Sequence, residues 1–130
     1  MNFTELAQKY QTPLYAYDFD KLTASYNELK DVFKARKSII NYAVKSNSNM
    51  SVIKHFANLG SGADCVSIGE VRRALLAGIP KYKIIFSGVG KKDEEIREAL
   101  KEGILFINLE SEAEMRRVDM IAKELNIIAR

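Results

Sequence analysis

The chain has 130 residues, of which 47% are hydrophobic and 28% are charged, and its formal net charge is +3. This length suffices for one compact domain with a buried core, and so small a charge gives no reason to expect nucleic acid as a partner. No apolar run approaches the ~18 residues of a membrane-spanning helix, and residues 1–5 do not resemble a signal peptide. The single Cys65 cannot form an internal disulfide, which favours a reducing cytoplasm.

Helical and strand patterns alternate along the chain. The first expected helix has apolar side chains at Leu22, Tyr26, Leu29 and Phe33, with Asp20 as its expected cap. Strands are expected at residues 38–45, 63–67, 83–87 and 104–109, and a helix is expected after each of them. The sequence predicts helix ends near glycines 60, 78 and 103. It also predicts two capping boxes, which pair Ser67 with Glu70 and Ser111 with Glu114.

The expected strands end about every 22 residues, so the pattern is a repeating strand–helix unit. Such a repeat predicts a parallel sheet, either an open doubly wound sheet or a barrel. Four units by themselves favour the open sheet. Residues 126–130 read as the opening of a fifth strand, so we expect the chain to be a piece of a longer protein.

The stretch Ile39–Asn47, IINYAVKSN, places Lys45 at the end of an expected strand. Ligands bind at the carboxyl ends of the strands in either type of parallel fold. The lysine stem can simply lie along apolar surface while the ammonium reaches water. Alternatively, an amine held away from water can form a Schiff base with a carbonyl substrate or with pyridoxal phosphate. The residues of this stretch alone leave both interpretations open.

Other polar residues near the expected strand ends are weaker candidates. Asp64 lies inside a strand, where it could face Lys45 from the adjacent strand or cap a neighbouring loop. Residues 87–92, SGVGKK, resemble a phosphate-binding loop without the Walker spacing, and a flexible loop at the ligand end is the better interpretation. Glu110 has the matching position on the next strand and can supply the N-terminal charge of a helix. His55 and Cys65 are expected to be packing residues, and no metal-ligand spacing occurs.

At YAVKSN the sequence resembles the pyridoxal-phosphate-dependent decarboxylases of the alanine-racemase-like class, fold type III, in which Tyr-Ala-x-Lys-x-Asn ends the first barrel strand. Four ordered segments carry the same resemblance: TPLYAYD at residues 12–18, GADCVSIGEVRRALLAGI at 62–79, IIFSGVGKKDEEI at 84–96 and FINLESEAEM at 106–115. The resemblance implies that residues 20–130 are the first half of a (β/α)8 barrel, in place of an open sheet. Residues 1–19 would contribute a strand to a β-rich second domain that is absent from this chain.

The resemblance also implies the roles of individual residues. Lys45 would hold pyridoxal 5'-phosphate through a Schiff base, and Asp64 would sit beside it as a catalytic and cofactor-binding residue. Ser87 and Gly88 would belong to a loop at the ligand end, and no metal is implied. The family places its cofactor-stacking histidine, its glycine-rich phosphate loop and its acidic partner of the pyridine nitrogen on later strands, outside these 130 residues.

The implied activity is decarboxylation of an amino acid, with meso-2,6-diaminopimelate as substrate and L-lysine as product, by a cytoplasmic homodimer. Neither nucleic acid nor membrane is an expected partner. Two alternatives remain open: a related decarboxylase for basic amino acids or the polyamine pathway, and a non-catalytic protein that binds pyridoxal phosphate in a single barrel. We expect the 130-residue piece alone to be inactive, with sheet edges through which it could oligomerise.

Overall fold

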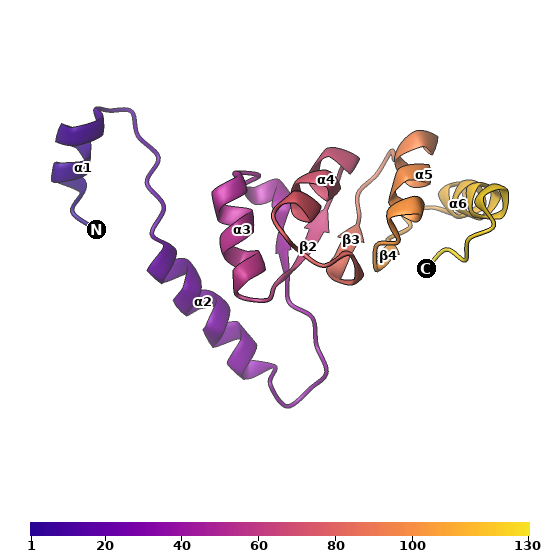
Figure 1. Ribbon diagram of the computed structural model, residues 1–130, viewed down its shortest axis with the longest axis horizontal. Helices are drawn as coiled ribbons and strands as arrows, with labels where there is room; N and C mark the ends of the chain where they lie inside the picture. The colour runs from indigo at the N-terminus through magenta and orange to yellow at the C-terminus, as the bar shows by residue number, and fades with distance from the viewer. The chain divides into compact units, whose positions relative to one another are not determined.

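The computed structural model describes residues 1–130, which divide into two units, residues 1–36 and 37–130 (Figure 1). The first unit contains helices α1 (Phe3–Tyr10) and α2 (Phe19–Val32). The side chain of Asp18 caps α2 by accepting a hydrogen bond from the backbone N–H of Lys21. The prediction of Asp20 as the cap was therefore wrong, because Asp20 already lies within the first turn.

Residues 12–18 connect the two helices and form no helix or strand. The assignment of residues 1–19 to a second, β-rich domain stays a prediction, as does the domain boundary after residue 19. The structure itself divides the chain after Arg36. The sequence did not predict α1, whose first turn is capped by Asn2.

The second unit alternates strands and helices. Its elements are β1 (Asn41–Ala43), the 3-10 helix η1 (Val44–Ser46), α3 (Met50–Asn58), β2 (Gly62–Cys65), α4 (Ile68–Leu76), the 3-10 helix η2 (Lys81–Lys83), β3 (Ile84–Phe86), α5 (Asp93–Glu102), β4 (Phe106–Ile107) and α6 (Glu112–Leu125). The order of elements agrees with the prediction, but every strand is shorter than predicted. Lys45 consequently lies in the 3-10 helix that follows β1, and not in the strand.

The four strands form one parallel sheet in the order β1-β2-β3-β4. Ala43 pairs with Asp64, Asp64 with Ile85, and Ile85 with Phe106, so these four residues form one row across the sheet. A doubly wound sheet reverses its strand order at a switch point. The sequential order found here is that of a barrel, in which each unit adds its strand beside the previous one.

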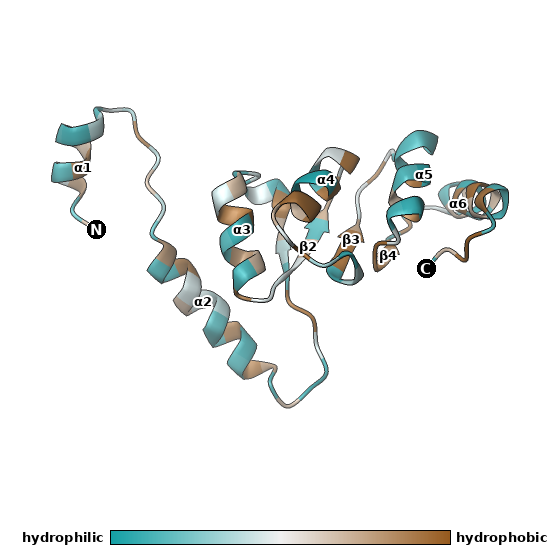
Figure 2. Cartoon of the chain, viewed as in Figure 1, coloured by the Kyte–Doolittle hydropathy of each residue, from teal (hydrophilic) through white to brown (hydrophobic).

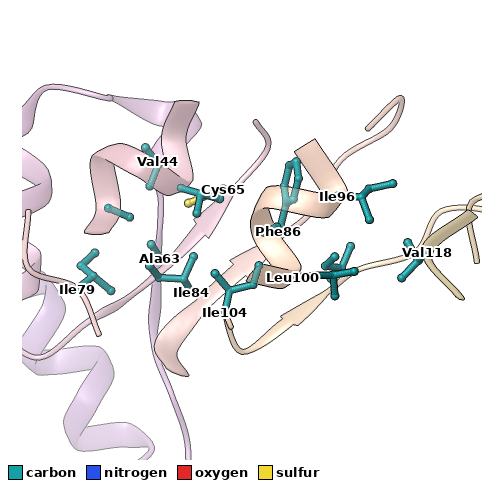
Figure 3. Close-up of a cluster of buried hydrophobic side chains, with 14 of the residues drawn as sticks. Val44, Ala63, Cys65, Ile79, Ile84, Phe86, Ile96, Leu100, Ile104 and Val118 are labelled. Carbon is teal, nitrogen blue, oxygen red and sulfur yellow. The ribbon is translucent and has the colours of Figure 1, made fainter. Parts of the chain in front are cut away.

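One face of the sheet forms the core. Ala63 and Cys65 of β2, and Ile84 and Phe86 of β3, alternate with more exposed residues and are fully buried. Their side chains join others from the helices in a continuous cluster, part of which Figure 3 shows: Val44, Ala63, Cys65, Ile79, Ile84, Phe86, Ile96, Leu100, Ile104 and Val118. The opposite row, which includes Asp64 and Ile85, is only half-buried. The helices therefore cover one face and leave the other face more open.

The helices of this unit are amphipathic, as Figure 2 shows for α5, whose hydrophilic surface contrasts with the hydrophobic β3 and β4. Helix α5 begins at Asp93 and ends before Gly103, which adopts a left-handed conformation with φ of 68°. The end at Gly103 agrees with the prediction. No helix of the structure has the length and apolar character needed to cross a membrane.

Helices α4 and α6 begin with the same arrangement, which we call the serine–glutamate joint. Ser67 Oγ accepts a hydrogen bond from the N–H of Glu70, and Ser111 Oγ accepts one from the N–H of Glu114. Each glutamate carboxylate in turn accepts the N–H of the residue before the serine, at 2.8 Å in both joints. The predicted serine caps are confirmed. In a capping box the glutamate side chain accepts the N–H of the serine itself, whereas here it accepts the N–H of the residue before the serine.

The last residues of the chain approach the edge of β4. The backbone N–H of Ile107 donates to the carbonyl of Arg130 at 2.9 Å, although residues 126–130 are not assigned as a strand. This single bond lies on the side of β4 where the predicted fifth strand would pair.

Candidate functional site

Lys45 lies at the carboxyl end of β1, on the turn formed by η1. Val44 is fully buried in the core, so the next residue along the turn is directed away from it. The side chain of Lys45 is exposed and makes no hydrogen bond or ion pair. The amine therefore has no protein partner at this edge of the sheet, but within these residues it is exposed to water and not held away from it as the Schiff-base interpretation expected.

The turn that carries Lys45 is held by side chains of the same motif. Ser46 Oγ donates to the carbonyl of Ala43 at 2.7 Å, and the Tyr42 hydroxyl donates to the carbonyl of Asn47 at 2.9 Å. The Tyr42 ring also stacks on Phe56 of α3, with ring centroids 4.3 Å apart. These contacts explain the tyrosine and the small polar residue beside the lysine, since they fix the backbone on both sides of it.

Three side chains connect the carboxyl ends of the next three strands. Asp64 of β2 accepts a hydrogen bond from Ser87, which follows β3, with 2.5 Å between Oδ1 and Oγ. Ser87 Oγ accepts in turn from Asn108, which follows β4, at 2.9 Å from Nδ2. We call this set the Asp64–Ser87–Asn108 chain. Asp64 was predicted as a site residue, and the structure places predicted Ser87 in contact with it.

Lys45 lies in the turn that follows β1, and Asp64 lies in the neighbouring strand β2. Ala43 is the register partner of Asp64, and Lys45 follows Ala43 by two residues along the chain. No hydrogen bond or ion pair joins the two side chains. The structure thus brings the two predicted residues to the same edge of the sheet without direct contact, and their catalytic roles stay predictions.

The loop after β3 was considered as a phosphate-binding loop, and the contacts of its first lysine bear on that alternative. Gly88 adopts a φ of 90°, which favours glycine. Lys91 is only 3% exposed and its Nζ donates to the carbonyls of Gly88 and Asn108, at 2.6 and 2.8 Å. It also pairs with Glu114 at 3.2 Å. Because all three N–H groups of this ammonium have partners, Lys91 is not free to bind a phosphate.

Sequence reasoning missed the roles of Asn108, Lys91 and Glu114. Asn108 follows β4 directly, so its place at a strand end was the available signal. Glu114 was recognised only as part of a helix cap. Glu110, considered at the end of the fourth strand, is exposed, and its N–H donates to Glu114.

Cys65 and His55 were expected to be packing residues, and both pack against other residues of the protein. Cys65 is fully buried, and burial together with the nearby carboxylates of Glu70 and Asp64 raises the pKa of its thiol to about 12. A thiol with that pKa stays protonated and unreactive at neutral pH. His55 is half-buried and meets the ring of Phe56 edge-on.

A parallel sheet in sequential order, with an unpaired lysine and a carboxylate at the carboxyl edge, defines a ligand-binding domain of the (β/α) barrel class. Residues 19–130 match the family model of the pyridoxal-dependent decarboxylases, pyridoxal binding domain. The chain belongs to this family, and the resemblance found in the sequence is confirmed.

Relatives with curated names lie in the same family. The chain is 59% identical over 130 residues to the diaminopimelate decarboxylase of Campylobacter jejuni, and covers 32% of that protein. It is 57% identical over 129 residues to the diaminopimelate decarboxylase of Helicobacter pylori strain J99, again covering 32% of it. These alignments include 100% and 99% of the chain. The chain therefore spans about a third of the length of the curated relatives it matches.

Solved structures agree with the fold. The crystal structure of diaminopimelate decarboxylase from Helicobacter pylori complexed with L-lysine matches with a TM-score of 0.94 and 54% identity, over 99% of this chain and 33% of that one. A lysine/ornithine decarboxylase from Vibrio vulnificus complexed with cadaverine matches with a TM-score of 0.81 at 23% identity, over 91% and 32% of the two chains. The second likeness concerns the fold alone. The predicted fold class, the first half of a barrel, is confirmed.

Proposed function

We propose that this chain is part of a decarboxylase that converts meso-2,6-diaminopimelate to L-lysine with pyridoxal 5'-phosphate as cofactor. The observation that carries the proposal is the 59% identity to a diaminopimelate decarboxylase across the whole chain. The related lysine/ornithine decarboxylase is only 23% identical. That difference favours diaminopimelate over the alternative basic amino acids.

The residues at the carboxyl edge fit the cofactor. Lys45 offers an exposed amine without an ionic partner, held on a fixed turn, and such an amine can bind an aldehyde covalently. When bound, pyridoxal phosphate accepts the electron pair released with carbon dioxide. The groups that would bind its phosphate and its pyridine nitrogen are expected on later strands.

In the proposed reaction Lys45 would hold the cofactor through its amine. The amine of Lys45 would also move a proton at the reacting carbon. Asp64 orients the lysine from the adjacent strand, and Ser87 and Gly88 line the same edge. The fixed backbone around Lys45 supports this role, because a reacting group must keep its position between the two steps.

The cellular location and the oligomeric state of the protein follow from the same proposal. We infer that the protein works in the cytoplasm as a homodimer, with an amino acid as its small-molecule ligand. The free, buried Cys65 is compatible with a reducing compartment.

Borohydride reduction with pyridoxal 5'-phosphate tests the role of Lys45. The protein expressed from its complete coding sequence is reduced and its peptides are mapped. We expect the cofactor on Lys45, its loss in Lys45→Arg, and no change in Lys54→Arg, which alters an exposed lysine on α3. Cofactor on a different lysine would contradict the assignment. Residues 1–130 alone should bind the cofactor poorly.

Decarboxylation assays test the substrate. The same protein is supplied with meso-diaminopimelate, ornithine or arginine, and carbon dioxide release is measured. Preference for diaminopimelate supports the proposal. Faster release from ornithine or arginine would favour the alternative decarboxylases, and adduct formation without release from any of the three would favour a non-catalytic cofactor-binding protein.

A further inference from the structure

The Asp64–Ser87–Asn108 chain has a fixed direction. A serine hydroxyl has one hydrogen, and an ionised carboxylate can only accept. Ser87 must therefore give its hydrogen to Asp64 across the 2.5 Å contact. The remaining neighbour, Asn108, must donate to Ser87 Oγ through Nδ2. The order of donation runs from β4 through β3 to β2.

The far end of this chain, the exposed Asn108, is anchored through its main chain. The backbone N–H of Asn108 donates to the carbonyl of Phe86 at 2.9 Å, and its carbonyl accepts from the buried Lys91 at 2.8 Å. The backbone N–H of Ser87 donates to the carbonyl of Cys65 at 2.7 Å. The main chains of Asn108 and Ser87 are thus held, as is that of Asp64 within the sheet, so the side-chain hydrogen bonds are what orients the Asp64 carboxylate.

The hydrogen bond from Ser87 occupies one oxygen of Asp64. The other oxygen, Oδ2, makes no hydrogen bond in the structure and lies on the half-buried face of the sheet. In the register of the sheet, Lys45 follows Ala43, the partner of Asp64, by two residues. The arrangement leaves one carboxylate oxygen for a cationic group at the edge where Lys45 is carried.

We infer that Ser87, held by Asn108, is a positioning residue that fixes the Asp64 carboxylate so that its second oxygen can orient the Lys45 amine. This inference rests on the proposed function, in which Lys45 binds the cofactor. Ser87 itself need not touch the cofactor. Its effect passes through Asp64 and should vanish when Asp64 is absent.

A double-mutant cycle in the protein expressed from its complete coding sequence tests the inference. The measured quantity is the rate at which cofactor-free protein forms a borohydride-trapped adduct with pyridoxal 5'-phosphate on Lys45. We expect Ser87→Ala to slow this rate about tenfold, the scale of one lost hydrogen bond to a charged group. Ser87→Thr, which keeps the hydroxyl, should stay within about twofold of the original rate.

In the Asp64→Ala background, Ser87→Ala should change the rate less than about twofold, because there is no carboxylate left to position. Ser25→Ala, an exposed serine of α2 without a side-chain hydrogen bond, serves as the matched control. The inference is overturned if Ser87→Ala labels as fast as the original protein, or if it slows labelling equally in both backgrounds.

A replacement variant is needed if Ser87→Ala does not fold, and failure of the proposed function must be distinguished from failure of this inference. If Ser87→Ala does not fold, Asn108→Ala takes its place, since it removes the donor that orients the Ser87 hydroxyl. It should slow labelling only when Asp64 is present, and an equal effect in both backgrounds overturns the inference. If the unaltered protein carries the cofactor on a lysine other than Lys45, the proposed function has failed, whereas normal labelling of Lys45 without an effect of Ser87 contradicts this inference alone.

Discussion

Lys91 and Glu114 form an ion pair inside the protein, with 3.2 Å between Nζ and Oε1 and side chains that are only 1% and 8% exposed. The loop after β3 carries the lysine, and the first turn of α6 carries the glutamate. Because the other two N–H groups of the lysine bind main-chain carbonyls, the pair joins two strand–helix units and supports Asn108 at the edge of the sheet.

Removing the cation from this pair should be strongly destabilising. Lys91→Met leaves the Glu114 carboxylate buried without its partner, which we expect to lower the free energy of unfolding by about 3–5 kcal/mol. Urea unfolding followed by circular dichroism measures this loss. Lys92→Met, at the exposed neighbouring position, should change stability by less than about 0.5 kcal/mol. Equal losses in the two variants would show that the pair has no special role.

Gly62 of β2 is expected to tolerate no side chain. A Cβ there would overlap the Oδ1 atom of Asn41 and the carbonyl oxygen of Lys83. Gly62→Ala should therefore lower the free energy of unfolding by about 1–3 kcal/mol or more. Gly69→Ala is the matched control, because its Cβ would find its nearest neighbour, Ser67 Oγ, at 3.7 Å. A thermal unfolding midpoint unchanged in Gly62→Ala would contradict this prediction.

The buried Cys65 thiol predicts how stability depends on alkaline pH. Its pKa is raised to about 12 in the folded protein, from an ordinary value of 9.0. A raised thiol pKa means that the folded state disfavours the thiolate, so its contribution to stability is complete below pH 9 and declines as pH rises toward 12. The expected slope is about 1.4 kcal/mol per pH unit in this window. Urea unfolding of Cys65→Ala between pH 9 and 10.5 should show a shallower decline than the original protein.

The Tyr42 hydroxyl should contribute to the turn that carries Lys45. Tyr42→Phe keeps the ring on Phe56 but removes the hydrogen bond to the carbonyl of Asn47. We expect a loss of about 1 kcal/mol in the free energy of unfolding, measured by chemical denaturation. Tyr82 is 61% exposed and its hydroxyl makes no hydrogen bond, so Tyr82→Phe should have almost no effect. If the two variants lose the same stability, the hydroxyl does not hold the turn.

Local signals predicted the elements well where one short segment determines the structure. The end of α5 follows from Gly103, whose conformational preference acts within a single turn. The cap of α2 was misplaced because Asp18 and Asp20 are chemically alike, and only the backbone conformation decides between them. The strand ends were overextended because apolar residues such as Val44 continue into the core after the sheet pairing has stopped.

The candidate site was predictable only in part, because some of its contacts join residues that are distant in the sequence. The motif identified Lys45, whose role depends on residues next to it in the chain. The burial of Lys91 depends on Glu114, which is distant in sequence, and in the sequence Lys91 looks like one of two loop lysines. The hydrogen bond between Ser87 and Asp64 likewise depends on the register of two strands, which periodicity does not specify.

The serine–glutamate joint occurs twice, yet its two copies have diverged in what they do. In each copy one carboxylate oxygen closes the turn between strand and helix. In the second copy the remaining oxygen of Glu114 also receives Lys91, whereas Glu70 makes no ion pair. The second carboxylate oxygen of Glu114 thus gives one joint an additional ion pair, while the hydrogen bonds that close the turn are the same in both joints.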